Sequence, residues 1–228
     1  MNKRVTRIQS KGDSVWVNYL DLETNSNGVI RASHVVNTIP LFRLFEVQFD
    51  PPLSDQKQQA IRSMTWGSYF KTHIFLNKSA EKFWTIGKST SLPILTDSDL
   101  GVIYDGNPQE IGKVAIISLL VTGDAAEKFN LMPLDLVRAQ ILGGLEKMWP
   151  GFSKEVQDIE FYRYHPRAIA AWPVGRSRFD ELSNAIRTPE NRIYLAGDFT
   201  ESSHSDGAFI SAERAVRQIV ASKKNERV

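Results

Sequence analysis

The fold of this chain is decided by a stretch near its end: Arg192-Ile193-Tyr194-Leu195-Ala196-Gly197-Asp198-Phe199-Thr200, a short polar loop, and then Gly207-Ala208-Phe209-Ile210-Ser211-Ala212-Glu213-Arg214-Ala215-Val216-Arg217-Gln218-Ile219-Val220. The pattern predicts a buried strand that stops at a glycine and an acid, followed by a helix whose N-terminus faces the same place. The first N–H groups of a helix lack partners and carry the positive end of its dipole. We therefore expect a site for a phosphate, a carbonyl or a developing anion between the strand end and the helix start.

Composition limits the possible classes of protein. With 228 residues the chain can form one large domain or two smaller ones. A hydrophobic content of 42% and a charged content of 24% are ordinary for a globular protein. The net charge of +2 gives no electrostatic argument for a nucleic-acid or membrane partner. No apolar run reaches membrane-spanning length.

The chain has no cysteine, which excludes a disulfide framework, a thiolate metal site and a catalytic thiol. We predict no metal site, because His73 and His165 lie far apart in the sequence and lack other ligands. The amino end is positively charged but has no apolar run behind it, so we see no secretion signal. The composition permits a cytosolic protein, and we predict a cytoplasmic localisation.

Turns and alternating residues outline the first part of the chain. Residues 5–8 and 15–19 alternate as strands do, and a turn at Lys11–Ser14 joins them. A second turn is expected at Asn25–Gly28. Residues 34–38 then form an extended stretch that ends at Ile39-Pro40, because proline cannot continue the ladder. Ser54 is expected to cap a helix over residues 55–61.

The middle of the chain predicts further strands and helices. Residues 67–76 alternate, with Tyr69, Lys71 and His73 on one face and the more apolar residues turned inward. The other expected elements are a central strand over 114–121, a helix over 133–149 with Leu134, Val137, Ile141 and Leu145 on one stripe, a strand over 159–164 and a helix over 178–186.

The closing segment resembles a known flavin motif. Tyr194–Asp198, a variable loop, Gly207-Ala208 and Ser211–Ala215 are similar to the carboxy-terminal flavin motif of the flavin-containing amine oxidase superfamily. That superfamily also includes protoporphyrinogen oxidases and phytoene desaturases, whose motif commonly has aspartate where amine oxidases have glutamate. Asp198 resembles this second group.

Two further stretches agree with the resemblance in order and spacing. Val35–Pro40 followed by Phe49–Ser54 resembles the family's crossing from flavin domain to substrate domain. Gly67–Lys71 followed by Lys82-Phe83-Trp84 resembles the strand that carries the flavin-facing lysine of amine oxidases.

The fold class that the resemblance implies is α+β, as a fragment of an α/β flavoprotein with a mixed-sheet substrate domain. Residues 1–40 would supply partial strands of the FAD domain, residues 41–185 the substrate-binding domain, and residues 186–228 the closing strand and helix of the FAD domain.

One part of the family pattern is absent. These enzymes begin with a strand, a G-x-G-x-x-G turn and a helix that bind a dinucleotide. The 14 glycines of this chain include no pair two residues apart. We therefore expect the chain to bind FAD weakly or not at all by itself, and a partner chain is a possible source of the dinucleotide-binding domain.

The resemblance implies roles for individual residues. Gly197, Asp198, Gly207 and Ala208 would contact FAD, although glycines in a strand-to-helix turn also have a purely geometric explanation. Lys71 would be catalytic and hold a water beside the flavin; the alternative is a solvated lysine on the outer face of a strand.

Aromatic residues are candidates for a substrate pocket. Trp172, Tyr162 and Tyr164 would line a channel for an apolar substrate, and His204 falls roughly where amine oxidases place an aromatic wall of their substrate cage. Such aromatic residues are also common in a core. Ser203 and His204 suggest a hydrolase only by adjacency in sequence, which does not make a catalytic triad.

The sequence thus leads to one principal functional hypothesis and two alternatives. The principal one is an FAD-dependent oxidoreductase in which a hydride leaves a C–N or C–C bond of a small-molecule substrate for the flavin. The first alternative is a non-catalytic substrate-binding or partner subunit of a split flavoprotein, or a gene remnant. The second is a hydrolase that uses Ser203 and His204.

Overall fold

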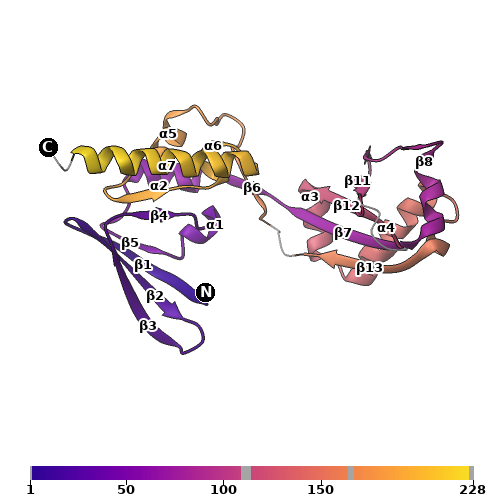
Figure 1. The fold of residues 1–228 in the computed structure, drawn as a ribbon, viewed down its shortest axis with the longest axis horizontal. Coiled ribbons are helices and arrows are strands. Elements are labelled where there is room, and N and C mark those ends of the chain that lie inside the picture. The colour runs from indigo at the N-terminus through magenta and orange to yellow at the C-terminus, as the bar shows by residue number, and fades with distance from the viewer. Residues whose placement is uncertain (1, 109–113, 164–166, 226–228) are drawn as a thin grey trace. The chain divides into compact units, whose positions relative to one another are not determined.

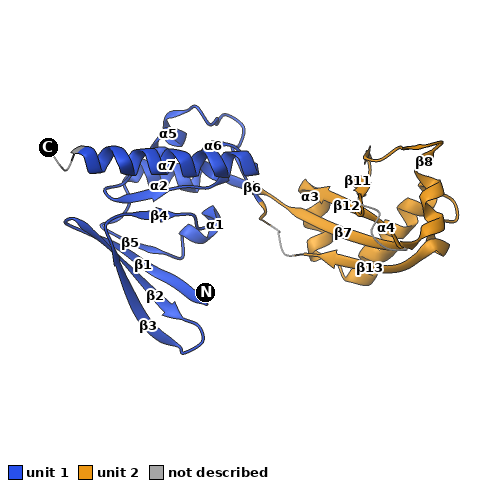
Figure 2. Ribbon diagram, viewed as in Figure 1, with its two compact units in different colours: residues 1–66, 169–228 blue, residues 67–168 orange. Residues whose placement is uncertain are grey.

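The computed structural model describes residues 2–108, 114–163 and 167–225. The chain divides into two compact units, one formed by residues 1–66 and 169–228 (unit 1) and the other by residues 67–168 (unit 2) (Figures 1 and 2). Within the described residues, none of the helices has both the length and the apolar character needed to cross a membrane.

Unit 1 combines three small sheets with helices. Its elements are β1 (Lys3–Lys11), β2 (Ser14–Asp21), β3 (Ser26–Ala32), β4 (Val35–Asn37), α1 (Leu41–Leu44), β5 (Gln48–Asp50), α2 (Asp55–Arg62), β6 (Thr65–Gly67, whose last residue begins unit 2), β14 (Ile169–Ala171), α5 (Glu181–Arg187), β15 (Ile193–Leu195), α6 (Asp198–Glu201) and α7 (Ser205–Asn225). The sheets have the strand orders β3-β2-β1-β5, β15-β4 and β14-β6.

The parallel pair of β4 and β15 lies at the centre of unit 1. Ile193 and Leu195 of β15 point to one face and pack into two hydrophobic clusters, one with Ile8 and Val15 and one with residues of α1 and α2. Tyr194 points to the other face, where Ala215 and Ile219 of α7 pack against it. Helix α7 therefore covers β15 on one side, and the unit's main core covers it on the other.

Unit 2 is a five-stranded sheet with helices packed against one face. Its elements are β7 (Tyr69–Asn77), η1 (Lys78–Phe83), β8 (Thr85–Ile86), β9 (Ser89–Thr90), β10 (Ile94–Leu95), β11 (Val102–Asp105), β12 (Val114–Thr122), α3 (Gly123–Leu131), α4 (Leu134–Met148), η2 (Phe152–Glu155) and β13 (Val156–Tyr162). The strand order is β10-β11-β12-β7-β13, with each neighbouring pair antiparallel.

Two of the predicted strands of this sheet are confirmed at its centre. Strand β12 lies at the sheet's centre, as its apolar run predicts. Along β7 the alternate residues Phe70, Thr72, Ile74 and Leu76 are buried. They share one core with Phe129 of α3 and the inner stripe of α4.

Several expected elements begin or end elsewhere. The second turn lies before Ser26, with Asn25 at a positive φ of 52°, and Gly28 is inside β3, where the Tyr19 ring occupies the space of a side chain. Helix α5 begins at Glu181 because the Asp180 carboxylate caps it by accepting from Ser183 N at 2.7 Å.

Three details of the helices and strands are also corrected. Ser54 precedes α2 but does not cap it, since its hydroxyl donates to Glu190 instead. Leu134 is not on the buried stripe of α4, because it is the first residue of that helix and 43% exposed. Strand β13 begins at Val156, three residues before the predicted start, and Tyr164 and His165 lie outside the described residues.

The compact units are not the same division as the predicted domains. The units change at residues 66/67 and 168/169, whereas the predicted domains change at 40/41 and 185/186. The division into compact units rests on contacts within the chain, and it does not test which residues bind a flavin and which bind a substrate. The assignment of residues 1–40, 41–185 and 186–228 therefore stays a prediction.

Candidate functional site

The carboxyl end of β15 turns at Gly197. Ala196 N donates to Asn37 O at 3.0 Å, which continues the pairing with β4 up to the turn. Gly197 has φ 148°, and a Cβ there would lie 2.6 Å from Cε1 of Phe199. The turn is held from the helix side, because Gly197 N donates to the buried Ser211 hydroxyl at 2.8 Å. The glycine is thus required by the backbone geometry.

The start of the long helix requires a second glycine. Helix α7 begins at Ser205, two residues earlier than Gly207, and the four-residue helix α6 precedes it. A Cβ at Gly207 would collide with the backbone of Ser202. The polar loop between α6 and α7 therefore passes directly against the first turn of α7.

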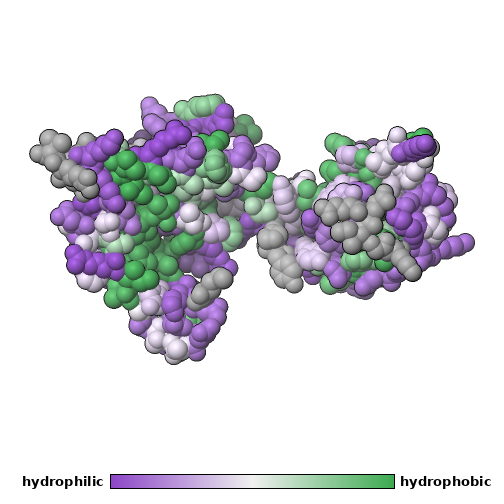
Figure 3. Space-filling model, in the orientation of Figure 1, coloured by the Kyte–Doolittle hydropathy of each residue, from purple (hydrophilic) through white to green (hydrophobic). Residues whose placement is uncertain are grey.

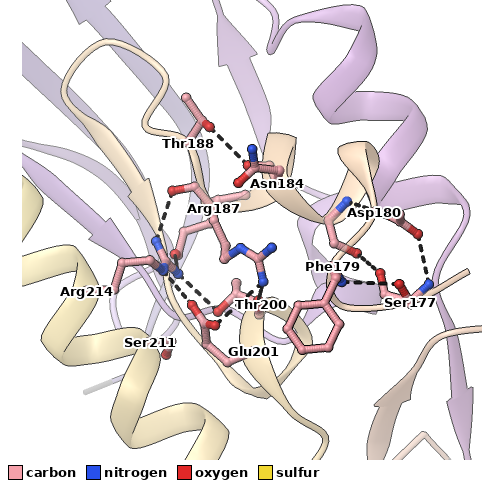
Figure 4. Close-up of polar contacts among 12 residues, drawn as sticks. Ser177, Phe179, Asp180, Asn184, Arg187, Thr188, Thr200, Glu201, Ser211 and Arg214 are labelled. Atoms are coloured by element: carbon pink, nitrogen blue, oxygen red, sulfur yellow. Dashed lines mark hydrogen bonds and ion pairs between the residues drawn. The ribbon is translucent and has the colours of Figure 1, made fainter.

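Arg214 of α7 binds the segments on both sides of the Gly197 turn (Figure 4). Its guanidinium donates to Leu195 O at 2.9 Å, to Arg187 O at 3.0 Å and to the Thr200 hydroxyl at 3.0 Å. It also pairs with the Glu201 carboxylate at 2.7 Å. One side chain of α7 thus binds the end of β15, the end of α5 and both final residues of α6.

Asp198 and Ser203 bind the loop to strand β14. The Asp198 carboxylate accepts from Ala170 N at 3.3 Å, and the Ser203 hydroxyl donates to Ala170 O at 2.5 Å. Asp198 is half-buried and is the first residue of α6. The segment from Gly197 to Ser203 is therefore anchored at both ends.

The carboxyl ends of β4 and β15 lie together, and Asn37 is the last residue of β4. Its side chain is 3% exposed, its Oδ1 accepts from Ile39 N at 2.9 Å, and its Nδ2 has no hydrogen-bond partner among the described residues. Ligands of open parallel sheets bind outside the carboxyl ends of the strands. An unsatisfied buried donor at this edge, beside two glycines and a helix start, fits a polar ligand such as a flavin.

The other unit 1 candidates occupy different surroundings. His204 and Ala208 are exposed at the start of α7, and Ala208 N donates to His204 O at 3.2 Å. Trp172 is half-buried against the cluster of α1, α2 and α5, and its indole N–H donates to Ser183 at 2.8 Å. Trp172 therefore already has a structural role.

Lys71 and Tyr162 belong to unit 2, where they are direct neighbours on adjacent strands β7 and β13. Lys71 Nζ lies 5.6 Å from the centre of the Tyr104 ring, and the Tyr162 hydroxyl donates to Glu160 at 2.6 Å. The predicted placement of Lys71 away from the core is confirmed.

His73 lies on the same face as Lys71. Its Nδ1 is 2.6 Å from the Ser118 hydroxyl, and its ring contacts Tyr162 edge-on at 5.2 Å. Burial lowers the pKa of His73, the Lys71 charge lowers it further, and Glu160 opposes both. This face therefore presents a cationic lysine beside a neutral imidazole at neutral pH.

The geometry gives no support to a hydrolase. The Ser203 proton is directed to the Ala170 carbonyl rather than to a base. The nearby Asp206 carboxylate accepts from Ser202 at 3.2 Å and 3.3 Å. Ser203 and His204 are adjacent in sequence, but the structure does not pair the serine hydroxyl with a base.

Comparison with known proteins identifies the family. The family model described as flavin containing amine oxidoreductase matches residues 1–220. The chain belongs to this family. Its members are flavoproteins, which agrees with FAD as the predicted cofactor and with the α+β flavoprotein fold.

Relatives of known activity are about twice as long as this chain. L-Amino-acid oxidase of Vipera ammodytes ammodytes is 28% identical over 96% of this chain and 46% of that protein. L-Amino-acid oxidase of Pseudechis australis is 26% identical over 100% of this chain and 45% of that protein. The chain thus spans about half the length of the curated relatives it matches.

Solved structures show the same fold. Cyclohexylamine oxidase from Brevibacterium oxydans IH-35A has a TM-score of 0.75 and 17% identity, over 97% of this chain and 48% of that one. Wild-type putrescine oxidase bound to putrescine has a TM-score of 0.77 and 18% identity, over 96% and 49%. Whether Asp198 places the chain in the desaturase subgroup stays a prediction.

Asn37, Ser211 and Arg214 were not singled out from the sequence as site residues. Ser211 and Arg214 are three positions apart in a helix that the sequence predicts from its apolar residues. This spacing places both side chains toward β15. Asn37, at the end of an apolar strand, is a further sequence signal of a polar site, because a buried side-chain amide needs hydrogen-bond partners.

Proposed function

We propose that this chain provides the flavin-facing edge and the substrate-binding sheet of an FAD-dependent amine oxidoreductase. The single observation that supports this most is the meeting of the carboxyl ends of β4 and β15 with the start of α7, in a chain of this family. Bound FAD would supply the hydride acceptor. A C–N bond of an amine or amino acid is the favoured donor, because the relatives are named as oxidases of such compounds.

The unit 1 residues would bind and orient the cofactor. Gly197 and Gly207 would keep the turn and the start of α7 in the conformation that the cofactor needs, because the Phe199 ring and the Ser202 backbone leave no room for a side chain at either position. The start of α7, including Ala208, offers the positive end of a helix dipole, which favours negative charge nearby. Asn37 Nδ2 is available as a donor, and the Asp198 carboxylate is available as an acceptor for hydroxyl groups.

The unit 2 residues would act on the substrate side. Lys71 offers an ammonium group, and we assign it the role of holding a water beside the reacting atoms. Neutral His73 and the Ser118 hydroxyl would keep that face polar without adding a second cation. Tyr162 is the proposed aromatic contact for a substrate on this face of unit 2. Trp172 and His204, which belong to unit 1, stay proposed substrate contacts of that unit.

A dinucleotide-binding half is part of this proposal, because the relatives extend beyond the region that this chain matches. A cytoplasmic setting remains a prediction. A non-catalytic partner subunit is the second candidate. The two differ in one property, which is whether the flavin of the completed protein is reduced by an amine.

The test is an anaerobic reduction assay. The chain is mixed with FAD and with a polypeptide made of the residues of the Vipera ammodytes ammodytes oxidase that lie outside the match. Cyclohexylamine, putrescine and an L-amino acid are added separately, and the visible flavin absorbance is followed. Bleaching by one of them is expected, and a flavin that stays oxidised with all three contradicts the enzyme and favours the binding subunit.

The role of Lys71 is tested in the same assay. Lys71→Met is expected to slow reoxidation of the reduced flavin by oxygen while leaving flavin retention unchanged. Lys147→Met changes an exposed lysine of α4 in the same unit and is the matched control. Equal reoxidation rates for the two variants would leave Lys71 as a solvated lysine.

A further inference from the structure

One face of the unit 2 sheet, opposite to the core that it shares with α3 and α4, carries a row of polar side chains. His73 of β7 lies between Ser118 of β12 and Glu160 of β13. Tyr104 of β11 is paired with Ser118 in turn, so the row crosses four strands. Lys71 precedes His73 by two residues and therefore points to the same face of the sheet.

The surface of unit 2 offers few apolar contacts to a ligand. In the view of Figure 3 its visible surface is mainly hydrophilic, with scattered apolar residues. The exposed side chains of Ile86, Leu95 and Leu131 belong to three different elements, β8, β10 and α3. Apolar residues that are scattered singly are normal for a surface and do not mark a binding site. A ligand of this unit would therefore be recognised by directed polar groups.

Ser118 is the buried member of the polar row. Its side chain is 0% exposed, and its hydroxyl lies 2.6 Å from Nδ1 of His73. Gly106 covers the hydroxyl from the side of β11, because a Cβ there would lie 2.7 Å from Oγ of Ser118. Gly106 N also donates to Ile116 O at 2.9 Å, which holds the two strands together at this point. The hydroxyl is therefore enclosed by protein and has His73 as its partner.

The enclosed hydroxyl decides which nitrogen of His73 carries the proton. A buried hydroxyl needs an acceptor for its hydrogen, and the acceptor that the described residues offer is Nδ1 of His73. Nδ1 accepts only when it carries no hydrogen, so the proton of the neutral ring lies on Nε2. A proton on Nδ1 would leave the Ser118 hydrogen buried without an acceptor among the described residues. The serine therefore holds His73 as a neutral ring that donates from Nε2.

The surroundings of His73 agree with this state. Burial and the charge of Lys71 both lower the pKa of His73, and Glu160 opposes them. The Tyr162 ring contacts the imidazole edge-on at 5.2 Å. Glu160 accepts from the Tyr162 hydroxyl at 2.6 Å, so this carboxylate already has a donor on its own strand. The face thus combines a fixed N–H donor with a lysine cation, and both groups suit a carboxylate ligand.

We propose that His73 is a substrate-binding residue whose Nε2–H donates to a carboxylate oxygen of the substrate, and that Ser118 is the positioning residue that fixes this donor. The positive charge of Lys71 on the same face adds to the attraction. The substrate is then an amine that also carries a carboxylate. The inference rests on the proposed function, and it goes beyond that function by naming the group that selects amino acids over plain amines.

The first measurement needs neither a ligand nor a flavin. Proton–nitrogen NMR correlation of the full chain, labelled at its histidine rings, reports which ring nitrogen carries the proton, and His73→Gln identifies the signals by their loss. The Nε2–H form is expected at neutral pH. Ser118→Ala should produce a mixture of both neutral forms. Thr122→Val removes an exposed hydroxyl from the same face of the same strand and should leave the signals unchanged.

The second measurement adds three probes to the same labelled chain. L-Phenylalanine and phenethylamine share an amine and a ring and differ by a carboxylate, and hydrocinnamate keeps the carboxylate without the amine. The two carboxylates should shift the His73 signals, and phenethylamine should not. His73→Phe should weaken L-phenylalanine binding about tenfold, because a hydrogen bond to a charged group is lost. His73→Gln keeps an N–H donor and should lose less, and Thr122→Val should bind as the unmodified chain does.

The role of Ser118 is overturned by an Nδ1–H ring in the unmodified chain, or by an Nε2–H ring that Ser118→Ala leaves unchanged. The carboxylate contact is overturned if neither carboxylate shifts the His73 signals, or if phenethylamine shifts them equally. The three probes on the unmodified chain decide the matter even if a His73 variant does not fold. Binding as expected in a protein whose flavin no amine reduces would instead refute the proposed enzyme and keep the contact.

Discussion

At the residue scale, the site depends on positions where no other side chain fits. Gly197 is required by its backbone angle and by the Phe199 ring, and Gly207 by the backbone of Ser202. Both glycines are also where the resemblance places flavin contacts. The structure gives a geometric reason for both glycines, and their contact with a flavin stays a prediction.

Gly207→Ala is expected to destabilise the chain by about 1 to 3 kcal/mol, because the added Cβ meets backbone that cannot move aside alone. Gly143→Ala is the matched control, since Gly143 lies inside helix α4 with nothing within 4 Å of an added Cβ. It should stabilise by about 0.5 to 1 kcal/mol. Urea unfolding measures both, and a neutral Gly207→Ala would contradict the close approach of loop and helix.

Arg214→Met is expected to cost about 3 kcal/mol, because it leaves two carbonyls and the Glu201 carboxylate without their shared donor. Arg217→Met removes an exposed ion pair with Glu213 on the same helix and should cost about 0.5 kcal/mol or less. Hydrogen exchange of residues 196–202 should rise only in the Arg214 variant. Equal protection in the two variants would show that Arg214 does not hold the loop.

At the element scale, a buried lysine joins α2 to the segment that precedes β15. Lys57 is buried, donates to the Thr188 carbonyl and lies 3.8 Å from Glu190. Burial lowers the pKa of Lys57 to about 8, with Glu190 opposing the shift and Arg214 adding to it. The charged form is therefore less favourable in the folded chain than in the unfolded one.

The lowered pKa of Lys57 predicts that the free energy of unfolding depends on pH. Between pH of about 8 and 10.5 the unfolded state binds more protons, so the free energy of unfolding should rise with pH across that window. The gain is up to about 3 kcal/mol. Lys57→Met should flatten the rise, as measured by urea unfolding at several pH values. The same slope in both proteins would mean that Lys57 titrates normally.

Elements with strong periodicity could be predicted from the sequence. The hairpin of β1 and β2, the inward face of β7, the central strand β12 and helix α4 all follow from alternation or a helical stripe. The departures from the predicted elements are caused by individual contacts with other parts of the chain, which periodicity does not show. Gly28 lies inside a strand, where the Tyr19 ring packs in the space that a side chain would need. Ser54 does not cap its helix, because its hydroxyl donates to Glu190, far along the chain.

Part of the site could be predicted and part could not. The strand end at Gly197 and the helix after Gly207 were expected from the sequence, but helix α6 between them was not. Four residues are too few to show a period, and α6 depends on Arg214 from the following helix. The role of Asn37 could not be predicted for a related reason: only the pairing of β4 with β15 shows that its side-chain amide is buried without a partner for Nδ2.

At the scale of the whole molecule, each unit has its own hydrophobic core. The buried cluster of unit 2 contains only residues between Phe70 and Ile159, and those of unit 1 lie outside that range. The ends of unit 2 meet, because Ala168 N donates to Gly67 O at 2.9 Å. Unit 2 is thus arranged like an insertion into unit 1.

This organisation predicts that residues 67–168 fold when expressed alone. Their thermal unfolding should be cooperative, because the sheet, α3 and α4 keep all their core contacts. The readouts are circular dichroism and calorimetry. Ile117→Asp, in the centre of that core, is the unfolded reference. An excised unit with the spectrum of this reference would contradict independent cores.

We infer that this chain holds one half of a flavin site. Retention of FAD after gel filtration tests this most directly, with the chain alone and with the unmatched part of the Vipera ammodytes ammodytes oxidase added. We predict that the chain alone elutes without flavin and that the mixture elutes with about one FAD per complex. Stoichiometric FAD on the chain alone, or none on the mixture, would contradict the claim.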